Sequence, residues 1–140
     1  MKKNTDELQS ELMSANSIAE YITANEESFV DNSVTKLIVG LFEGRGISKA
    51  ELARRSGSST VYIHQVFSGR RNPSRSKLIC LGIGMGISLE EMQALLKAAG
   101  YAPLYPANKR DSVIIFGLHH GESLSEIDEA LYENDMETLT

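Results

Sequence analysis

Apolar residues recur along this chain at helical spacings, and no stretch of useful length alternates between apolar and polar residues. The clearest pattern places apolar residues at i, i+3, i+4, i+7 and i+8, at Val34, Leu37, Ile38, Leu41 and Phe42. Such spacing gives a helix one apolar face that a core can bury. Proline, which interrupts helices, is absent before position 73. The pattern predicts an all-α fold.

Capping and breaking residues divide the chain into successive helices. Ser48 and Glu51 have the spacing of a capping box, as do Ser88 with Glu91 and Ser123 with Glu126. Glycine at 44, 46, 57, 69 and 86 is expected to end helices. The predicted helices cover 33–43, the stretch between Ser48 and Gly57, about 60–67, 111–118 and 124–132. Two more are predicted, one opened by Pro73 and Ser74 and running through Met85, the other capped at Ser88 and running through Leu96.

The N-terminal region carries a second apolar stripe. Between residues 6 and 24 the stripe consists of Leu8, Leu12, Ala15, Ala19 and Ile22, at spacings of four, three, four and three. This spacing predicts one helix with a narrow apolar seam. The seam would pack against the chain's own core or against a partner, and the sequence leaves both open.

The remaining global features indicate a soluble, cytoplasmic protein. No apolar run approaches the roughly 20 residues that cross a bilayer, and the first residues are polar, unlike a signal peptide. The single cysteine, Cys80, lies in an apolar run and is expected to be buried. We expect four regions: an arm (1–31), a central domain (32–99), a helical extension (100–133) and a frayed tail (134–140).

Charge is segregated along the chain. Residues 45–77 contain eight Lys or Arg against Glu51 alone, whereas residues 1–44 contain three against eight acids, and residues 78–140 three against ten. A basic block in an acidic chain suggests a polyanionic partner. The alternative is that the block pairs with the protein's own acidic flanks.

Within the basic block, two short predicted helices are joined by a turn with Gly57 at the joint. Ala53 is small enough for close helix contact, and Gly57 accommodates a positive φ at little cost. Ile63 and Val66 are spaced to face back onto the first helix. The arrangement predicts a helix-turn-helix.

The stretch GISKAELARRSGSSTVYIHQVFSGRRNPSRSKLICLGIGMGISLEEM resembles the lambda-repressor-like (Xre-type) helix-turn-helix family, over about residues 33–97. The resemblance implies a five-helix core, preceded here by a helical arm and followed by two short helices. The segment after residue 94 is similar to an extension of small Firmicute regulators of this type.

The resemblance also implies which residues meet DNA. The helix at about 60–67 would enter the major groove, with phosphate contacts on both sides. Val61 departs from the family, where this position is usually polar, and would meet a thymine methyl group. Gln65 would present its amide to adenine or hydrogen-bond elsewhere. The implied nucleic-acid-binding residues are Lys49, Ser59, Thr60, Val61, Tyr62, His64, Gln65, Arg70, Arg71 and Asn72.

Several of these interpretations have alternatives. Arg54 and Arg55 would contact phosphate or merely complement the helix dipole, and His64 is equally compatible with a groove contact and with no role. Phe67 occupies a position that is usually polar in the family, and a place in the core is favoured. His119 and His120 are adjacent and lack further ligands for a metal site.

The predicted function is sequence-specific binding of double-stranded DNA by a transcriptional regulator that is a homodimer. The pattern favours neither an enzyme nor a cofactor or metal. The alternative is a protein-interaction adaptor, a partner of a kinase or toxin, that uses the extension after Gly100 and binds DNA weakly or not at all. The helices at 111–132 and the 8–22 stripe are the candidate dimer surfaces.

Overall fold

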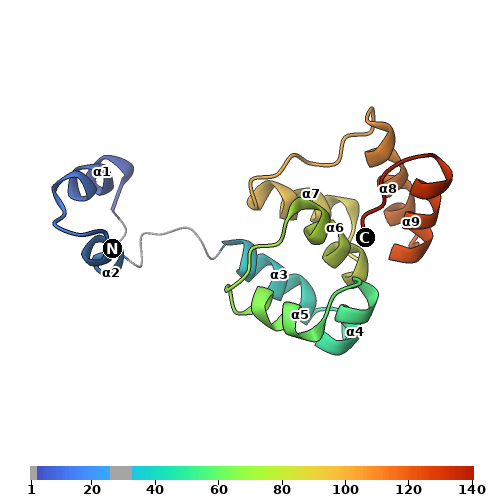
Figure 1. Ribbon diagram of the computed structural model, residues 1–140, viewed down its shortest axis with the longest axis horizontal. Coiled ribbons are helices and arrows are strands. Elements are labelled where there is room, and N and C mark those ends of the chain that lie inside the picture. Colours follow the sequence, from blue (N-terminus) through green and yellow to red (C-terminus); the bar gives the residue numbers. More distant parts are fainter. Residues whose placement is uncertain (1–2, 26–32) are drawn as a thin grey trace. The chain divides into compact units, whose positions relative to one another are not determined.

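A computed structural model describes residues 3–25 and 33–140. Every regular element in these two ranges is an α-helix (Figure 1), as the periodicity predicts. The helices are α1 (Thr5–Ser14), α2 (Ile18–Ala24), α3 (Ser33–Glu43), α4 (Lys49–Arg55), α5 (Thr60–Phe67), α6 (Arg75–Met85), α7 (Leu89–Ala98), α8 (Lys109–His119) and α9 (Leu124–Glu133).

The chain forms two compact units, residues 1–32 and 33–140. The predicted boundary between arm and central domain, at residues 31 and 32, lies outside the described residues. The second unit contains the helices of the predicted central domain, α3 to α7. It also contains α8, α9 and the segment 134–140.

The single N-terminal helix predicted over 6–24 is wrong. Helix α1 ends at Ser14, and the backbone of Ala15 is extended with ψ of 141°. Ser17 then caps a new helix by accepting a hydrogen bond from the Glu20 amide. The spacing of Ser17 and Glu20 is that of a helix start, so the interruption has a local signal that the apolar stripe obscures. Leu12 and Ile22 from the predicted seam remain 43% and 46% exposed.

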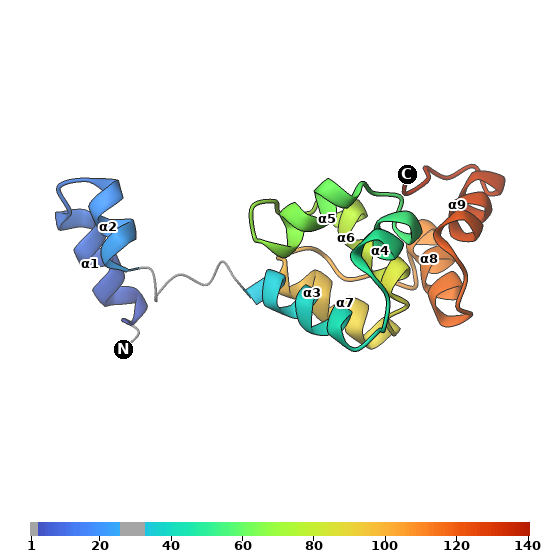
Figure 2. The ribbon, with the colours of Figure 1, turned by 90° about the horizontal axis from the view of Figure 1, so that it is seen from below.

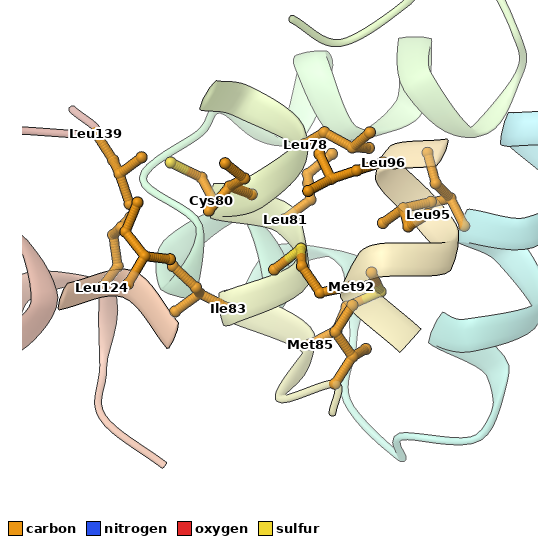
Figure 3. Packing of buried hydrophobic residues seen from close by; sticks show 14 of the residues in the cluster. Leu78, Cys80, Leu81, Ile83, Met85, Met92, Leu95, Leu96, Leu124 and Leu139 are labelled. Carbon is orange, nitrogen blue, oxygen red and sulfur yellow. The ribbon is translucent and has the colours of Figure 1, made fainter. Parts of the chain in front are cut away.

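Helix α6 lies at the centre of the second unit. Every residue from Leu78 to Met85 is buried, so α6 is enclosed on all sides instead of having one apolar face. Figure 3 shows side chains of α6 between those of α7, such as Leu96 and Met92, and those of the C-terminal region. Cys80, on α6, is 1% exposed, as predicted.

The two glycines inside α6 allow neighbouring helices to approach it. A Cβ atom at Gly84 would lie 3.1 Å from the Ser56 backbone nitrogen and from the Leu52 Cδ1 atom of α4. At Gly82 it would lie 2.9 Å from the Met92 Sδ atom of α7. Helices α4 and α7 therefore pack against backbone where a larger residue would hold them apart.

Helices α8 and α9 lie side by side at the end of the second unit (Figures 1 and 2), where α8 contacts α7 and α9 contacts α6. The capping boxes predicted at Ser88 and Ser123 are both present. Helix α8 begins at Lys109, two residues earlier than predicted, because the Asn108 side chain caps it by accepting from the Asp111 amide.

The tail predicted to fray is packed against the second unit. Leu139 is only 7% exposed and belongs to the same apolar cluster as Leu124 and Cys80. The Met136 amide donates to the Leu131 carbonyl over 2.9 Å and so turns the chain back from the end of α9. The side chains of Asp128 and Arg110 form hydrogen bonds with the backbone of the tail. The polar sequence of the tail does not indicate these contacts.

Within the described ranges, none of the helices combines the length and the apolar character that crossing a membrane requires.

Candidate nucleic-acid interface

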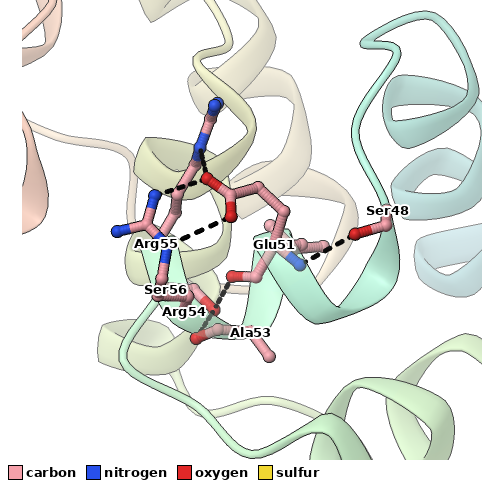
Figure 4. Close-up of polar contacts among 7 residues, drawn as sticks. Ser48, Glu51, Ala53, Arg54, Arg55 and Ser56 are labelled. Carbon is pink, nitrogen blue, oxygen red and sulfur yellow. Dashed lines mark hydrogen bonds and ion pairs between the residues drawn. The ribbon is translucent and has the colours of Figure 1, made fainter.

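Helix α4 is fixed at its start by Ser48, whose hydroxyl accepts from the Glu51 amide over 3.0 Å. The reciprocal half of the predicted capping box is absent in the structure. The Glu51 carboxylate is instead turned toward the guanidinium groups of Arg54 and Arg55 (Figure 4). Hydrogen bonds from Arg54, and then from Arg55, lower the pKa of Glu51 to about 2.

The turn between α4 and α5 has the geometry that the sequence predicts. Gly57 has φ of +66°, a conformation that side chains disfavour. Ser59 caps α5 by accepting from the Tyr62 amide over 3.0 Å. Ile63 and Val66 are buried, so α5 packs against α4 through this face and presents its other face outward.

The outward face of α5 carries several of the predicted base-contacting residues. Thr60, Val61 and His64 are exposed, and Val61 is 66% exposed although it is apolar. Gln65 is half-buried, and its side-chain oxygen accepts from Arg71 Nε over 3.4 Å. The amide predicted to face adenine is therefore partly engaged within the protein.

A shallow groove runs along this face. Its volume is about 520 Å³, and it combines an exposed apolar side chain with two cations and several hydrogen-bonding groups. The residues lining it are Lys49, Val61, His64, Gln65, Phe67, Ser68 and Arg70.

The structure divides the eight cations of the basic block into two sets. Four have carboxylate partners among the described residues, but only Arg45 and Arg75 pair with an acidic flank, as the alternative has it. Arg54 and Arg55 pair with Glu51 on the same helix. Across longer sequence distances, Arg45 pairs with Glu91 over 2.9 Å and Arg75 with Asp111 over 3.5 Å.

The other four cations form no ion pair within the described part of the chain, and all of them flank α5. Lys49 lies over the Phe67 ring with Nζ 5.4 Å from its centroid, and Arg70 follows α5 with an exposed side chain. Arg71 and Lys77 both lie over the Tyr62 ring, 6.0 and 5.6 Å from its centroid. The two aromatic rings thus hold cations on two sides of the exposed face.

Lys77 is a candidate residue that the sequence interpretation missed. It lies in the first turn of α6, fifteen residues after Tyr62, and only the packing of α6 brings the two together. The available signal was its position within the basic block and its lack of an acidic neighbour three or four residues away.

Comparison with known families agrees with this geometry. Residues 41–92, which include α4, the Gly57 turn and α5, match the model of the helix-turn-helix family. We call residues 41–92 the helix-turn-helix domain, because α4, the Gly57 turn and α5 form this motif within them. No curated protein and no solved structure matches the chain. The matched family is a DNA-binding one of the lambda-repressor-like (Xre-type) kind, in agreement with the resemblance of this stretch of sequence.

The segment between α5 and α6 is held by hydrogen bonds at both of its ends. The amides of Arg70 and Arg71 both donate to the Gln65 carbonyl, over 3.0 and 3.2 Å. Tyr101 Oη donates to the Pro73 carbonyl over 2.7 Å, which fixes the far end of this turn. Asn72 and both arginines are exposed in between, on a backbone that is already ordered.

Tyr62 and Phe67 are both half-buried, and they lie at the edges of the exposed face of α5. Burial raises the pKa of the Tyr62 phenol and outweighs the opposing effect of Arg71, so the hydroxyl remains a donor at neutral pH. Phe67 packs edge-on against Phe42, with ring centroids 5.0 Å apart. Phe67 therefore belongs to the packed interior and also borders the groove.

The adjacent histidines of α8 lie outside this interface. His120 stacks on Phe116 with centroids 4.0 Å apart, and its Nδ1 atom is 2.8 Å from the Phe116 carbonyl oxygen. Among the described residues, no group of three or more His, Cys, Asp or Glu side chains is arranged to hold a metal ion.

Proposed function

We propose that this protein is a transcriptional regulator that binds double-stranded DNA sequence-specifically, with α5 in the major groove. The supporting observation is the division of the cations. The cations with no carboxylate partner among the described residues surround the exposed face of α5, whereas the others are paired elsewhere. Unpaired cations at this face neutralise phosphates and release counterions without first breaking an ion pair.

In this proposal the residues around α5 have two roles. Lys49, Tyr62, Arg70, Arg71, Asn72 and Lys77 contact phosphates and set the orientation of the domain, and Ser59 positions the start of α5. Thr60, Val61, His64 and the amide nitrogen of Gln65 meet base edges, and the exposed methyl groups of Val61 suit a thymine methyl. We further propose that the protein binds as a homodimer, whose half-sites would lie about one helical turn apart.

Two double variants with the same charge change test the phosphate contacts. R70Q/R71Q removes two unpaired arginines, and the control R54Q/R55Q removes two that pair with Glu51. For R70Q/R71Q, we expect the slope of log affinity against log salt to become shallower by about two, because the slope is about 0.9 per phosphate contact. The control should retain most of the wild-type slope. Equal effects of the two variants would contradict the assignment.

Selection of bound fragments from random duplex DNA tests sequence specificity and symmetry together. An enriched palindrome supports a dimer on two half-sites, and a single enriched half-site supports a monomer. Val61→Ala should relax the preference at one base position, whereas Lys77→Gln should weaken binding to all sequences alike. No enrichment of any sequence would contradict the proposal of specific recognition.

An adaptor function is the second candidate, because α8 and α9 expose two large aromatic side chains. Phe116 is 58% and Tyr132 76% exposed. If the protein is an adaptor, F116A/Y132A abolishes capture of a protein partner, whereas R70Q/R71Q leaves capture unchanged. Wild-type affinity for duplex DNA would then be weak even at low salt.

A further inference from the structure

The segment 134–140 packs back onto the second unit after α9. Leu139 lies in the apolar cluster with Leu124 of α9 and Ile83 of α6, and Figure 3 shows these side chains on the same side of α6 as Cys80. With Leu139 only 7% exposed, burial of this side chain favours the packed position. We call residues 134–140 the strap.

Asp128 of α9 holds the end of the strap through three hydrogen bonds. Its Oδ1 atom accepts from the Leu139 amide over 2.6 Å, and its Oδ2 atom accepts from the Thr140 amide over 3.2 Å and from the Thr140 hydroxyl. Hydrogen bonds to a carboxylate are among the stronger ones in proteins. Within the described part of the chain Asp128 forms no ion pair, so these bonds to the strap are its main polar contacts.

Arg110 of α8 holds the middle of the strap. Its Nε atom donates to the Glu137 carbonyl over 2.8 Å, and its Nη2 atom donates to the Thr138 carbonyl over 3.3 Å. The strap is therefore attached to both helices of the extension, by Arg110 from α8 and by Asp128 from α9.

The end of the strap lies against the turn between α4 and α5. A Cβ atom at Gly57 would be 3.3 Å from the Thr140 Cγ2 atom and 3.4 Å from the Leu124 Cδ2 atom. Gly57 is the residue whose positive φ sets the direction of α5 relative to α4. The strap and the start of α9 thus cover the side of this turn that faces the extension.

A cavity of about 570 Å³ adjoins the same contact. Its lining includes Arg55 and Gly57 from the helix-turn-helix domain and Leu118, Leu124 and Thr140 from the extension and strap. Thr140 of the strap borders both this cavity and the turn.

We propose that the strap, latched by Asp128 and Arg110, holds the α4–α5 turn in its observed geometry, and that releasing the latch loosens the turn. The consequence for DNA rests on the proposed function above. A loosened turn lets α5 move relative to the phosphate contacts at Lys49, and affinity for duplex DNA falls. The extension is thereby a regulatory element acting on the helix-turn-helix domain.

Asp128→Asn tests the latch, and Glu129→Gln is the matched control, an exposed neighbour on α9 with the same change in charge. Hydrogen exchange is measured in full-length protein for residues 134–140 and for the turn, where the Ser58 amide donates to the Ala53 carbonyl. In Asp128→Asn, we expect exchange to accelerate by about tenfold in both segments, the change that loss of a charge-assisted hydrogen bond produces. Glu129→Gln should exchange as wild type does.

A second variant, Leu139→Ala, releases the strap from its apolar side and leaves Asp128 intact. It should accelerate exchange in the strap and in the turn alike, while a thermal melt verifies that the rest of the protein remains folded. Faster exchange in the strap without any change in the turn would overturn the proposed coupling. A strap that stays protected in Asp128→Asn would overturn the latch.

The exchange measurement needs no DNA, so it decides the coupling separately from the proposed function. Binding of the same variants to a mixed-sequence duplex of about 20 base pairs at low salt then tests the consequence. Asp128→Asn should bind the duplex about tenfold more weakly than Glu129→Gln does, because the affinity falls in proportion to the loosening of the turn that hydrogen exchange measures. A loosened turn with unchanged affinity would overturn the regulatory role. A wild-type protein that binds no duplex would contradict the DNA proposal alone.

Discussion

Single glycines decide how closely the helices of this protein approach one another. Gly117 of α8 is buried against α9, where an added Cβ atom would lie 2.8 Å from both the Ile127 Cδ1 atom and the Glu122 Oε1 atom. Ile127 is fully buried and β-branched, so it has little freedom to move aside. Gly40 of α3, in contrast, has open space around it.

Gly117→Ala and Gly40→Ala should therefore change stability in opposite directions. We expect Gly117→Ala to destabilise the protein by about 1–3 kcal/mol through overpacking. Gly40→Ala should stabilise it by up to about 1 kcal/mol, because alanine is the better helix former and nothing obstructs its Cβ. Chemical denaturation of the two variants measures both values. Stabilisation by Gly117→Ala would show that α8 and α9 are not packed as described.

Cys80 provides a residue-scale probe of global unfolding. It is 1% exposed, and burial raises the pKa of its thiol to about 11, so it is neither accessible nor ionised at neutral pH. A thiol reagent at pH 8 should modify the native protein at least about a thousandfold more slowly than the denatured chain. Comparable rates for native and denatured protein would mean that the core opens at α6.

At the scale of elements, the helices begin where short-range side-chain contacts fix them. Five helices begin after a serine whose side chain accepts a hydrogen bond from the amide three residues later. These serines are Ser48, Ser59, Ser74, Ser88 and Ser123. In α4 the acid of the predicted capping box serves a different purpose, because two arginines one turn later compete for the carboxylate of Glu51. The ion pairs hold Arg54 and Arg55 along α4 and reduce their availability for phosphate.

The depressed pKa of Glu51 predicts how the stability of α4 depends on pH. Because the folded-state pKa is about 2 against an ordinary value of 4.5, ionised Glu51 stabilises the fold above pH 4.5. This contribution is lost as pH falls from 4.5 toward 2. Wild type should thus be more stable than Glu51→Gln at pH 7, and the difference should shrink over that range and also at high salt.

Thermal melts of wild type, Glu51→Gln and the control Glu129→Gln across this pH range measure the effect. Glu129 is an exposed acid with no ion pair among the described residues. A pH-independent difference between wild type and Glu51→Gln would contradict the role of the ion pairs.

At the scale of the whole molecule, the apolar core belongs entirely to the second unit. All members of the buried cluster lie between Ile38 and Leu139, and in the described part of the first unit only Asn25 is buried. Two short helices that bury no apolar side chain contribute little folding free energy. The second unit therefore has the core it needs to fold by itself.

A chain lacking residues 1–32 should accordingly unfold in one cooperative transition. We expect its midpoint to differ from that of the full-length protein by no more than about 2 °C, since the core that sets the transition is retained. Differential scanning calorimetry at several protein concentrations makes the comparison. A large fall in the midpoint would show that the first unit contributes to the stability of the second.

The sequence by itself determined those features that depend on neighbouring residues. The all-α fold, the capped helix starts, the Gly57 turn and the exposed face of α5 follow from contacts within about one helical turn, where spacing alone specifies the geometry. The interruption between α1 and α2 has a signal of the same kind in Ser17 and Glu20. The prediction of a single helix missed this signal because the apolar stripe continues across the interruption.

Only the tertiary structure decided which charges remain available and how the C-terminal segment is used. Arg45 meets Glu91 and Arg75 meets Asp111 across 46 and 36 residues, and Lys77 lies over the Tyr62 ring only because the fold brings the start of α6 close to Tyr62. The strap likewise depends on Asp128, eleven residues before Leu139. Such pairs form when separately formed helices pack together, and the local pattern of residues does not encode where those helices meet.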